Sequence, residues 1–151
     1  RQMCIRDRVM ERTNIRYVTP EQLGEPLDLS VVDVSFISLK LVLPVIKNLL
    51  KPTGQVLCLI KPQFEAGKDK VGKKGVVREK STHKEVLDNF VALADELQFK
   101  ILGLTFSPVK GPEGNIEFLA HLTLDDADGI RPDTALVVES AHQTLDKGEN
   151  S

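Results

Sequence analysis

A lysine directly follows a short apolar run near the middle of the chain. Leu57 to Ile60 (LCLI) is typical of a buried strand, and Lys61 comes next, before a proline that ends the strand. A dry lysine costs free energy unless it is paired. The carboxyl edge of an open α/β sheet is also where ligands bind. Lys61 is therefore a candidate for chemistry, with a purely structural role as the alternative.

Two carboxylates could share this edge with Lys61. Asp33 stands near the end of another apolar run, LSVVDV, and Glu117 stands in NIEF, which we expect to lie inside a strand. Taken singly, Asp33 could simply cap a helix or fix a loop, and Glu117 could face solvent. Together they could hold a lysine and tune its proton affinity, which carboxylates raise and desolvation lowers. A lysine tuned in this way can act as a general base.

The rest of the pattern alternates strands with helices. Thr19 should cap a short helix, and Ser81 or Thr82 should cap a longer one, with Glu85 as the capping-box partner. Because the last two strands are joined by a short turn, we expect them to pair antiparallel. The order predicts an α/β fold with a mostly parallel sheet, a C-terminal antiparallel hairpin and helices on both faces. We expect strands at 29–34, 55–61, 100–106 and 115–124, the end of a strand at 9–10, and helices at 19–23, 38–50, 82–98 and 134–145.

Composition excludes several classes of site. The chain has 151 residues and a net charge of −2, with two cysteines and three scattered histidines, so it predicts neither a disulfide framework nor a metal site. It contains no apolar run of the roughly 18 residues that a membrane helix needs and no signal-peptide pattern. We therefore expect a cytoplasmic protein without a metal.

Positive charge gathers in one loop. Residues 61–80 contain seven Lys or Arg against three acids, whereas residues from 113 onward contain nine acids against two bases. The segment GKDKVGKK resembles a phosphate-binding loop but lacks its final Ser or Thr. The loop could be a solvated surface, or it could contact RNA phosphates through Lys70, Lys73, Lys74 and Arg78. Phe36 and Phe64 could stack on bases, although burial in the core is the favoured interpretation for both.

Three long motifs carry a resemblance to a known family. DVSFISLKLVLP, IKPQFEAGKDKVGKKGVVRE and SPVKGPEGNIEFLAHL, with ERTNIRY upstream, resemble the TlyA (hemolysin A) family of FtsJ-like RNA ribose 2′-O-methyltransferases. The resemblance covers residues 9–124. It implies a Rossmann-like methyltransferase fold, S-adenosylmethionine as cofactor, and ribosomal RNA as substrate, with cytidines in 16S and 23S rRNA as targets.

The resemblance also assigns roles to residues. The family uses a Lys-Asp-Lys-Glu catalytic set, in which Asp33 matches the aspartate, Lys61 the second lysine and Glu117 the glutamate. Asn14, in the ERTN turn, and Asp33 are the residues expected to bind the cofactor. The family's first lysine, its glycine-rich cofactor loop and its S4-type RNA-binding domain have no match in this sequence.

These departures predict a fragment. Met3 to Arg8 reads MCIRDR, which a common transposon-adapter end encodes, so we interpret residues 1–8 as a sequencing scar. Residues 9–124 would be the C-terminal part of the methyltransferase domain, inactive alone, and 125–151 an acidic linker with a short helix. The alternatives are a non-catalytic RNA- or ribosome-binding remnant and a pore-forming hemolysin.

Overall fold

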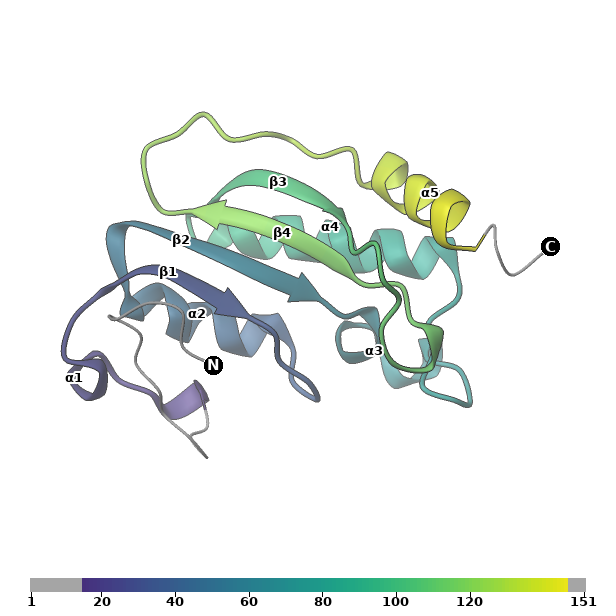
Figure 1. The fold of residues 1–151 in the computed structure, drawn as a ribbon, viewed down its shortest axis with the longest axis horizontal. Coiled ribbons are helices and arrows are strands. Elements are labelled where there is room, and N and C mark those ends of the chain that lie inside the picture. Colours follow the sequence, from purple (N-terminus) through teal and green to yellow (C-terminus); the bar gives the residue numbers. More distant parts are fainter. Residues whose placement is uncertain (1–14, 147–151) are drawn as a thin grey trace.

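The computed structural model describes residues 15–146, which form one sheet with helices packed against it (Figure 1). In chain order the elements are η1 (Ile15–Tyr17), α1 (Pro20–Leu23), β1 (Leu27–Val32), α2 (Leu39–Leu49), β2 (Leu50–Ile60), α3 (Pro62–Glu65), η2 (Lys68–Lys70), α4 (Lys80–Glu96), β3 (Lys100–Phe106), η3 (Pro112–Gly114), β4 (Phe118–Thr123) and α5 (Thr134–Leu145).

The sheet has the strand order β1-β2-β4-β3. β1 and β2 pair in parallel, and β4 lies between β2 and β3 and runs antiparallel to both. β1, β2 and β3 therefore share one direction, and their carboxyl ends lie at the same edge. The predicted class, a mostly parallel α/β sheet that ends in an antiparallel hairpin, is confirmed.

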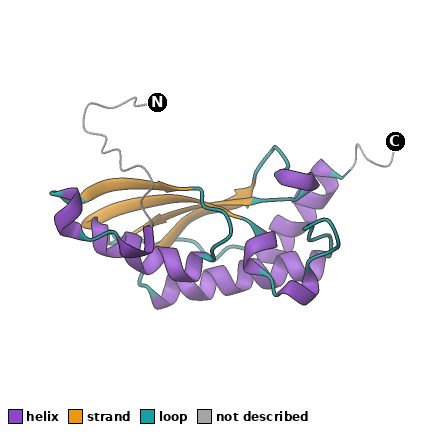
Figure 2. Cartoon of the chain, turned by 90° about the horizontal axis from the view of Figure 1, so that it is seen from below, coloured by secondary structure: helices purple, strands orange, loops and turns teal. Residues whose placement is uncertain are grey.

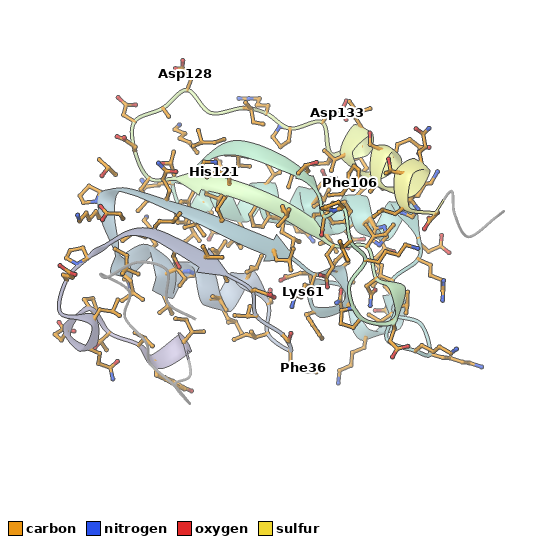
Figure 3. All side chains as sticks on the ribbon, viewed as in Figure 1. Phe36, Lys61, Phe106, His121, Asp128 and Asp133 are labelled. Atoms are coloured by element: carbon orange, nitrogen blue, oxygen red, sulfur yellow. The ribbon has the colours of Figure 1, made fainter. Side chains whose placement is uncertain are left out.

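The two long helices α2 and α4 lie on the same face of the sheet (Figure 2), and α5 packs against α4 and β3. On the opposite face, apolar side chains of three strands are exposed, with Val31 at 71%, Leu57 at 41% and Leu119 at 40%. His121, labelled on β4 in Figure 3, is also on this face, where it pairs with Gln55 of β2. Among the described residues, this second face has no long helix over it.

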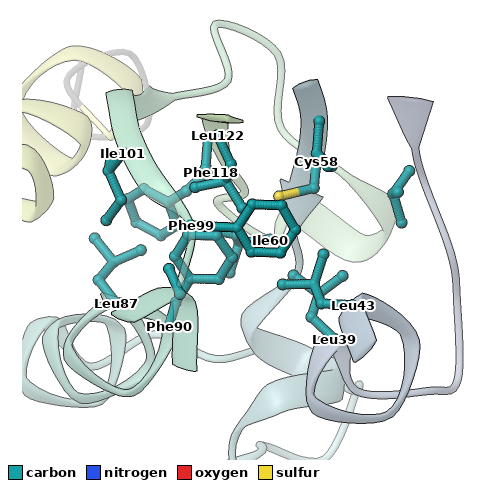
Figure 4. Packing of buried hydrophobic residues seen from close by; sticks show 14 of the residues in the cluster. Leu39, Leu43, Cys58, Ile60, Leu87, Phe90, Phe99, Ile101, Phe118 and Leu122 are labelled. Atoms are coloured by element: carbon teal, nitrogen blue, oxygen red, sulfur yellow. The ribbon is translucent and has the colours of Figure 1, made fainter. Parts of the chain in front are cut away.

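Alternate residues of the strands build the core under α2 and α4 (Figure 4). Cys58 and Ile60 of β2, and Phe118 and Leu122 of β4, are each at most 1% exposed. Fully burying one such apolar side chain is worth about 1.5–3 kcal/mol. Burial, and secondarily the charge of Glu65, raises the pKa of the Cys58 thiol to about 12. Cys58 is therefore a core residue, as its place in a buried strand predicts.

Several element ends differ from the sequence prediction. The prediction of Ser81 or Thr82 as the cap of α4 is wrong, because Glu79 precedes the helix and Thr82 is buried inside it. The predicted partner of that cap, Glu85, pairs instead with Lys70. β2 begins at Leu50, earlier than the predicted start at residue 55, and follows α2 directly.

Other ends agree with the prediction or lie outside the described residues. Thr19 caps α1 in a full capping box, as predicted. β4 begins only at Phe118, which leaves Glu117 just before the strand. The strand end predicted at 9–10 lies outside the described residues.

Candidate active site

Lys61 and Asp33 meet at the carboxyl edge of the sheet. Because β1 and β2 run in parallel with Val32 opposite Cys58, the residues that follow both strands come out side by side. Lys61 Nζ lies 2.6 Å from Asp33 Oδ1 and donates a hydrogen bond of 3.2 Å to Ser35 Oγ. The Lys61 side chain is only 12% exposed, whereas that of Asp33 is 64% exposed. The ammonium group of Lys61, which is labelled in Figure 3, is thus held in a fixed place, beside a carboxylate that still faces solvent.

Glu117 approaches the same edge from the antiparallel strand. Ile60 lies opposite Phe118, so Lys61 and Glu117 each stand one residue beyond that pair. The Glu117 carboxylate is buried and accepts a hydrogen bond of 2.9 Å from Gln63 Nε2, and it makes no ion pair with Lys61. Asp33 is therefore the carboxylate that contacts Lys61, and Glu117 forms a second, neighbouring pair with Gln63.

The Glu117–Gln63 pair is packed tightly on one side. The carboxylate lies against the backbone of Gly111, where a Cβ atom would clash with the carboxylate carbon and both of its oxygens. In Gln63, the other member of the pair, the Oε1 atom is buried and has no hydrogen-bond partner within residues 15–146. A buried acceptor without a donor is costly, so this oxygen and the carboxylate form an acceptor site suited to a donor from outside the described residues.

Glu65 ties the segment after β2 to the start of α2. Its carboxylate accepts from Ser38 Oγ at 2.7 Å and from the Leu39 backbone N–H at 2.8 Å, so it caps a helix from a distant part of the chain. Burial raises the pKa of Glu65, although the two hydrogen bonds act in the opposite direction. This cap fixes the α2 end of the loop that carries Asp33 and Ser35.

Phe36 projects from that same loop. Its side chain is 90% exposed, and its backbone has a φ of 65°, a conformation that aromatic residues rarely adopt. The ring lies 4.9 Å from the ring of Phe64, centroid to centroid. The favoured prediction of burial is wrong for Phe36, because the turn points its ring outward from the edge of the sheet (Figure 3).

The basic loop divides into a paired and an unpaired part. Lys70 forms an ion pair with Glu85, and the hydrogen bond that Lys70 donates to this carboxylate raises the pKa of Lys70. Lys73, Lys74 and Arg78 are exposed and form no ion pair with any residue that the structure describes. These three cations, like the exposed Lys68, are available to meet an anion.

Sequence reasoning missed three residues that complete the arrangement, namely Ser35, Gln63 and Gly111. The signals were present, since Ser35 and Gln63 each stand two residues after an identified site residue and Gly111 opens the turn before Glu117. Asn14, the weaker cofactor candidate, lies outside the described residues.

Residues 15–146 contain neither a metal-binding cluster nor a membrane-spanning helix. Within residues 15–146, no cluster of three or more His, Cys, Asp or Glu side chains has a geometry that could hold a metal. No helix in that range has the length and apolar character needed to cross a membrane.

The chain is similar in sequence to known methyltransferases. A model of the family described as FtsJ-like methyltransferase matches residues 3–124. The chain is 46% identical over 143 residues to the "Putative rRNA methyltransferase YqxC" of Bacillus subtilis (strain 168), covering 91% of this chain and 51% of that protein. It is 41% identical over 114 residues to the 16S/23S rRNA (cytidine-2'-O)-methyltransferase TlyA of Mycobacterium tuberculosis (strain ATCC 25618 / H37Rv), covering 76% and 42%.

A solved structure agrees with these relatives. The "Putative hemolysin from Streptococcus thermophilus" superimposes with a TM-score of 0.85 at 43% identity, over 95% of this chain and 53% of that one. The chain therefore spans about half the length of the curated and solved relatives that it matches.

Proposed function

Because the chain belongs to the FtsJ-like methyltransferase family, we propose that it is part of an enzyme that methylates the ribose 2′-hydroxyl of ribosomal RNA. The observation that carries the proposal is the Lys61–Asp33 pair, with its N–O distance of 2.6 Å, at the carboxyl edge of the sheet. Ligands of open α/β sheets bind at this edge. A nearly buried ammonium group there has a chemical use that a surface ion pair lacks.

Lys61 acts on the hydroxyl in this proposal. An ammonium group has three N–H donors, and Asp33 and Ser35 take two of them. The third is available to orient the 2′-hydroxyl, and loss of a proton would let the same nitrogen accept the hydroxyl proton. Asp33 keeps Lys61 in place. Glu117 and Gln63 form an acceptor site beside it, suited to the first catalytic lysine that the family uses.

S-adenosylmethionine is the proposed methyl donor, and it supplies an activated methyl group when bound. The Asp33 carboxylate fits a positively charged sulfonium cofactor, because its side chain is 64% exposed and so remains accessible beside Lys61. Asp33 would hold the cofactor from this side of the site, and Asn14 from the preceding segment. This chain alone lacks the family's glycine-rich loop, so we propose that it binds the cofactor poorly and is inactive by itself.

Ribosomal RNA in the ribosomal subunits is the proposed substrate, with cytidines of 16S and 23S rRNA as targets and the cytoplasm as the setting. Phe36 offers an exposed ring next to Lys61, and unpaired bases stack on such rings. Lys73, Lys74 and Arg78 would contact phosphates, with Lys70 contributing less because Glu85 already neutralises it.

The test uses a polypeptide of the length of its relatives that contains this chain. Lys61→Ala should abolish methyl transfer from labelled S-adenosylmethionine to rRNA while cofactor affinity changes little. Lys51→Ala is the matched control, because Lys51 also links β2 to β1, through Asp28 at 2.8 Å. Retained methylation in Lys61→Ala, or equal losses in both variants, would refute the role of Lys61.

A further inference from the structure

Two buried histidines join the last helix to the rest of the molecule. His83 lies in α4 and His142 in α5, and they are 0% and 9% exposed. His83 Nδ1 and His142 Nε2 are 2.7 Å apart, with ring centroids 4.9 Å apart. The second nitrogen of each ring also has a partner. His83 Nε2 lies 3.0 Å from the Val77 carbonyl oxygen, and His142 Nδ1 lies 2.9 Å from Asp146 Oδ2.

The partners determine where the protons are. A carbonyl oxygen can only accept, so His83 Nε2 must carry its proton. Burial, and then the charge of His142, lowers the pKa of His83 to about 4. His83 is therefore neutral near pH 7, and its Nδ1 accepts from His142 Nε2.

The other side of His142 faces an ionised carboxylate. Burial alone would raise the pKa of Asp146, but bonds from Lys110 and His142 lower it overall. Lys110 Nζ is 3.0 Å from Asp146 Oδ1. His142 Nδ1 lies beside that carboxylate and His142 Nε2 lies beside His83 Nδ1, so the His142 ring bridges His83 of α4 and Asp146 at the end of α5. Arg78 is the remaining charged residue that lines the small hollow around this pair.

The chain of contacts continues from His83 to Glu117. The Val77 N–H donates to Asn115 Oδ1 at 3.0 Å, and Asn115 Nδ2 donates to the carbonyl oxygens of Gly75 and Pro112 at 2.9 and 3.0 Å. The Gly111 N–H donates to the Asn115 carbonyl oxygen at 2.7 Å. Gly111 is the residue on which the Glu117 carboxylate rests.

We propose that His83, His142 and Asn115 are positioning residues, which hold Gly111 and thereby the Glu117 carboxylate in place. The inference rests on the proposed function for its effect on methylation. The hydrogen-bond arrangement itself does not depend on that function. In this proposal α5, which is far from Lys61 in the sequence, stabilises the position of Gly111 through His142.

The proton assignment is tested first, by ¹⁵N NMR of the histidine rings at pH 7. The expected spectrum shows the His83 ring as the neutral Nε2–H form. An Nδ1–H form of His83, or a His83 ring with both nitrogens protonated, would overturn the assignment.

The positioning role is tested with His142→Leu against Gln143→Ala, a change at an exposed position of the same helix. In hydrogen-exchange measurements, His142→Leu should speed exchange of the Gly111 amide at least tenfold, and Gln143→Ala should leave it unchanged. In the methylation assay, His142→Leu should lower kcat about tenfold with little change in KM for rRNA. Unchanged Gly111 exchange would overturn the proposal. If the unsubstituted enzyme does not methylate rRNA, the proposed function fails while the exchange result still decides this inference.

Discussion

The Glu117 carboxylate occupies the space where a side chain at position 111 would begin. Gly111→Ala should therefore displace the carboxylate or the loop, at a cost of about 1–3 kcal/mol in stability. We expect methylation to fall at least tenfold in the longer polypeptide. Gly103→Ala is the control, because a Cβ atom there would meet nothing within 4 Å. Full activity in Gly111→Ala would mean that the position of Glu117 does not matter.

His83 makes stability depend on pH in a defined direction. Its pKa is about 4 in the folded state, against an ordinary value of 6.5. The unfolded chain binds more protons between these values, so stability is present above pH 6.5 and is lost as the pH falls toward 4. At pH 5 the loss is about 2 kcal/mol relative to pH 7.5.

Urea unfolding at the two pH values checks this prediction. His83→Leu should be less stable at pH 7.5, because its partners lose their bonds, but should lose less on acidification. His121→Leu should retain the acid-dependent loss, because His121 lies on the uncovered face of the sheet. An equal loss in His83→Leu and the unsubstituted protein would contradict the assignment of His83.

The loop between β1 and α2 combines strain with exposure. Phe36 holds a φ of 65° while its ring is 90% exposed, so the backbone strain has no compensating burial. Phe36→Gly should stabilise the fold by about 1 kcal/mol, because glycine adopts this conformation freely. The same change should weaken RNA binding, since stacking of one base on an aromatic ring is worth about 1–3 kcal/mol.

Gln98→Gly separates the two effects. Gln98 has a φ of 67° at the end of α4, so it should gain stability in the same way without a change in RNA affinity. Denaturant unfolding and RNA titration measure the two quantities. Unchanged RNA affinity in Phe36→Gly would show that the ring does not contact RNA.

Most elements could be predicted from the sequence, because apolar periodicity and turn residues act locally. The bounds of β3 and α5 are those predicted, and Lys61 does follow a buried strand. The pairing of side chains could not be predicted in the same way. Gln63 and Glu117 are 54 residues apart, and their bond depends on the register between β2 and β4. The prediction of the α4 cap was wrong for a related reason, since tertiary packing buries Thr82.

At the scale of the whole molecule, positive charge is concentrated in residues 61–80, the loop proposed to contact RNA. Neutralising Lys73, Lys74 and Arg78 together should reduce the slope of log affinity against log salt by about 2, since each contact with single-stranded RNA contributes about 0.7. Lys70→Gln alone should change the slope little, because Glu85 already pairs with Lys70. An unchanged slope in the triple variant would indicate that the loop is an ordinary solvated surface.

The apolar face of the sheet, over which residues 15–146 place no long helix, fits the length of the relatives. Mostly parallel sheets are covered on both faces, and this chain spans about half of the proteins that it matches. Activity is therefore best measured on a longer polypeptide that contains this chain.

The central claim is methylation of a ribose hydroxyl assisted by Lys61, and alkaline hydrolysis of the labelled rRNA product tests it most directly. A 2′-O-methyl group removes the hydroxyl that attacks the phosphate, so the label should appear in alkali-resistant dinucleotides. Lys61→Ala should give no such dinucleotides. Label in mononucleotides, which would place the methyl group on a base, or resistant dinucleotides from Lys61→Ala, would contradict the account.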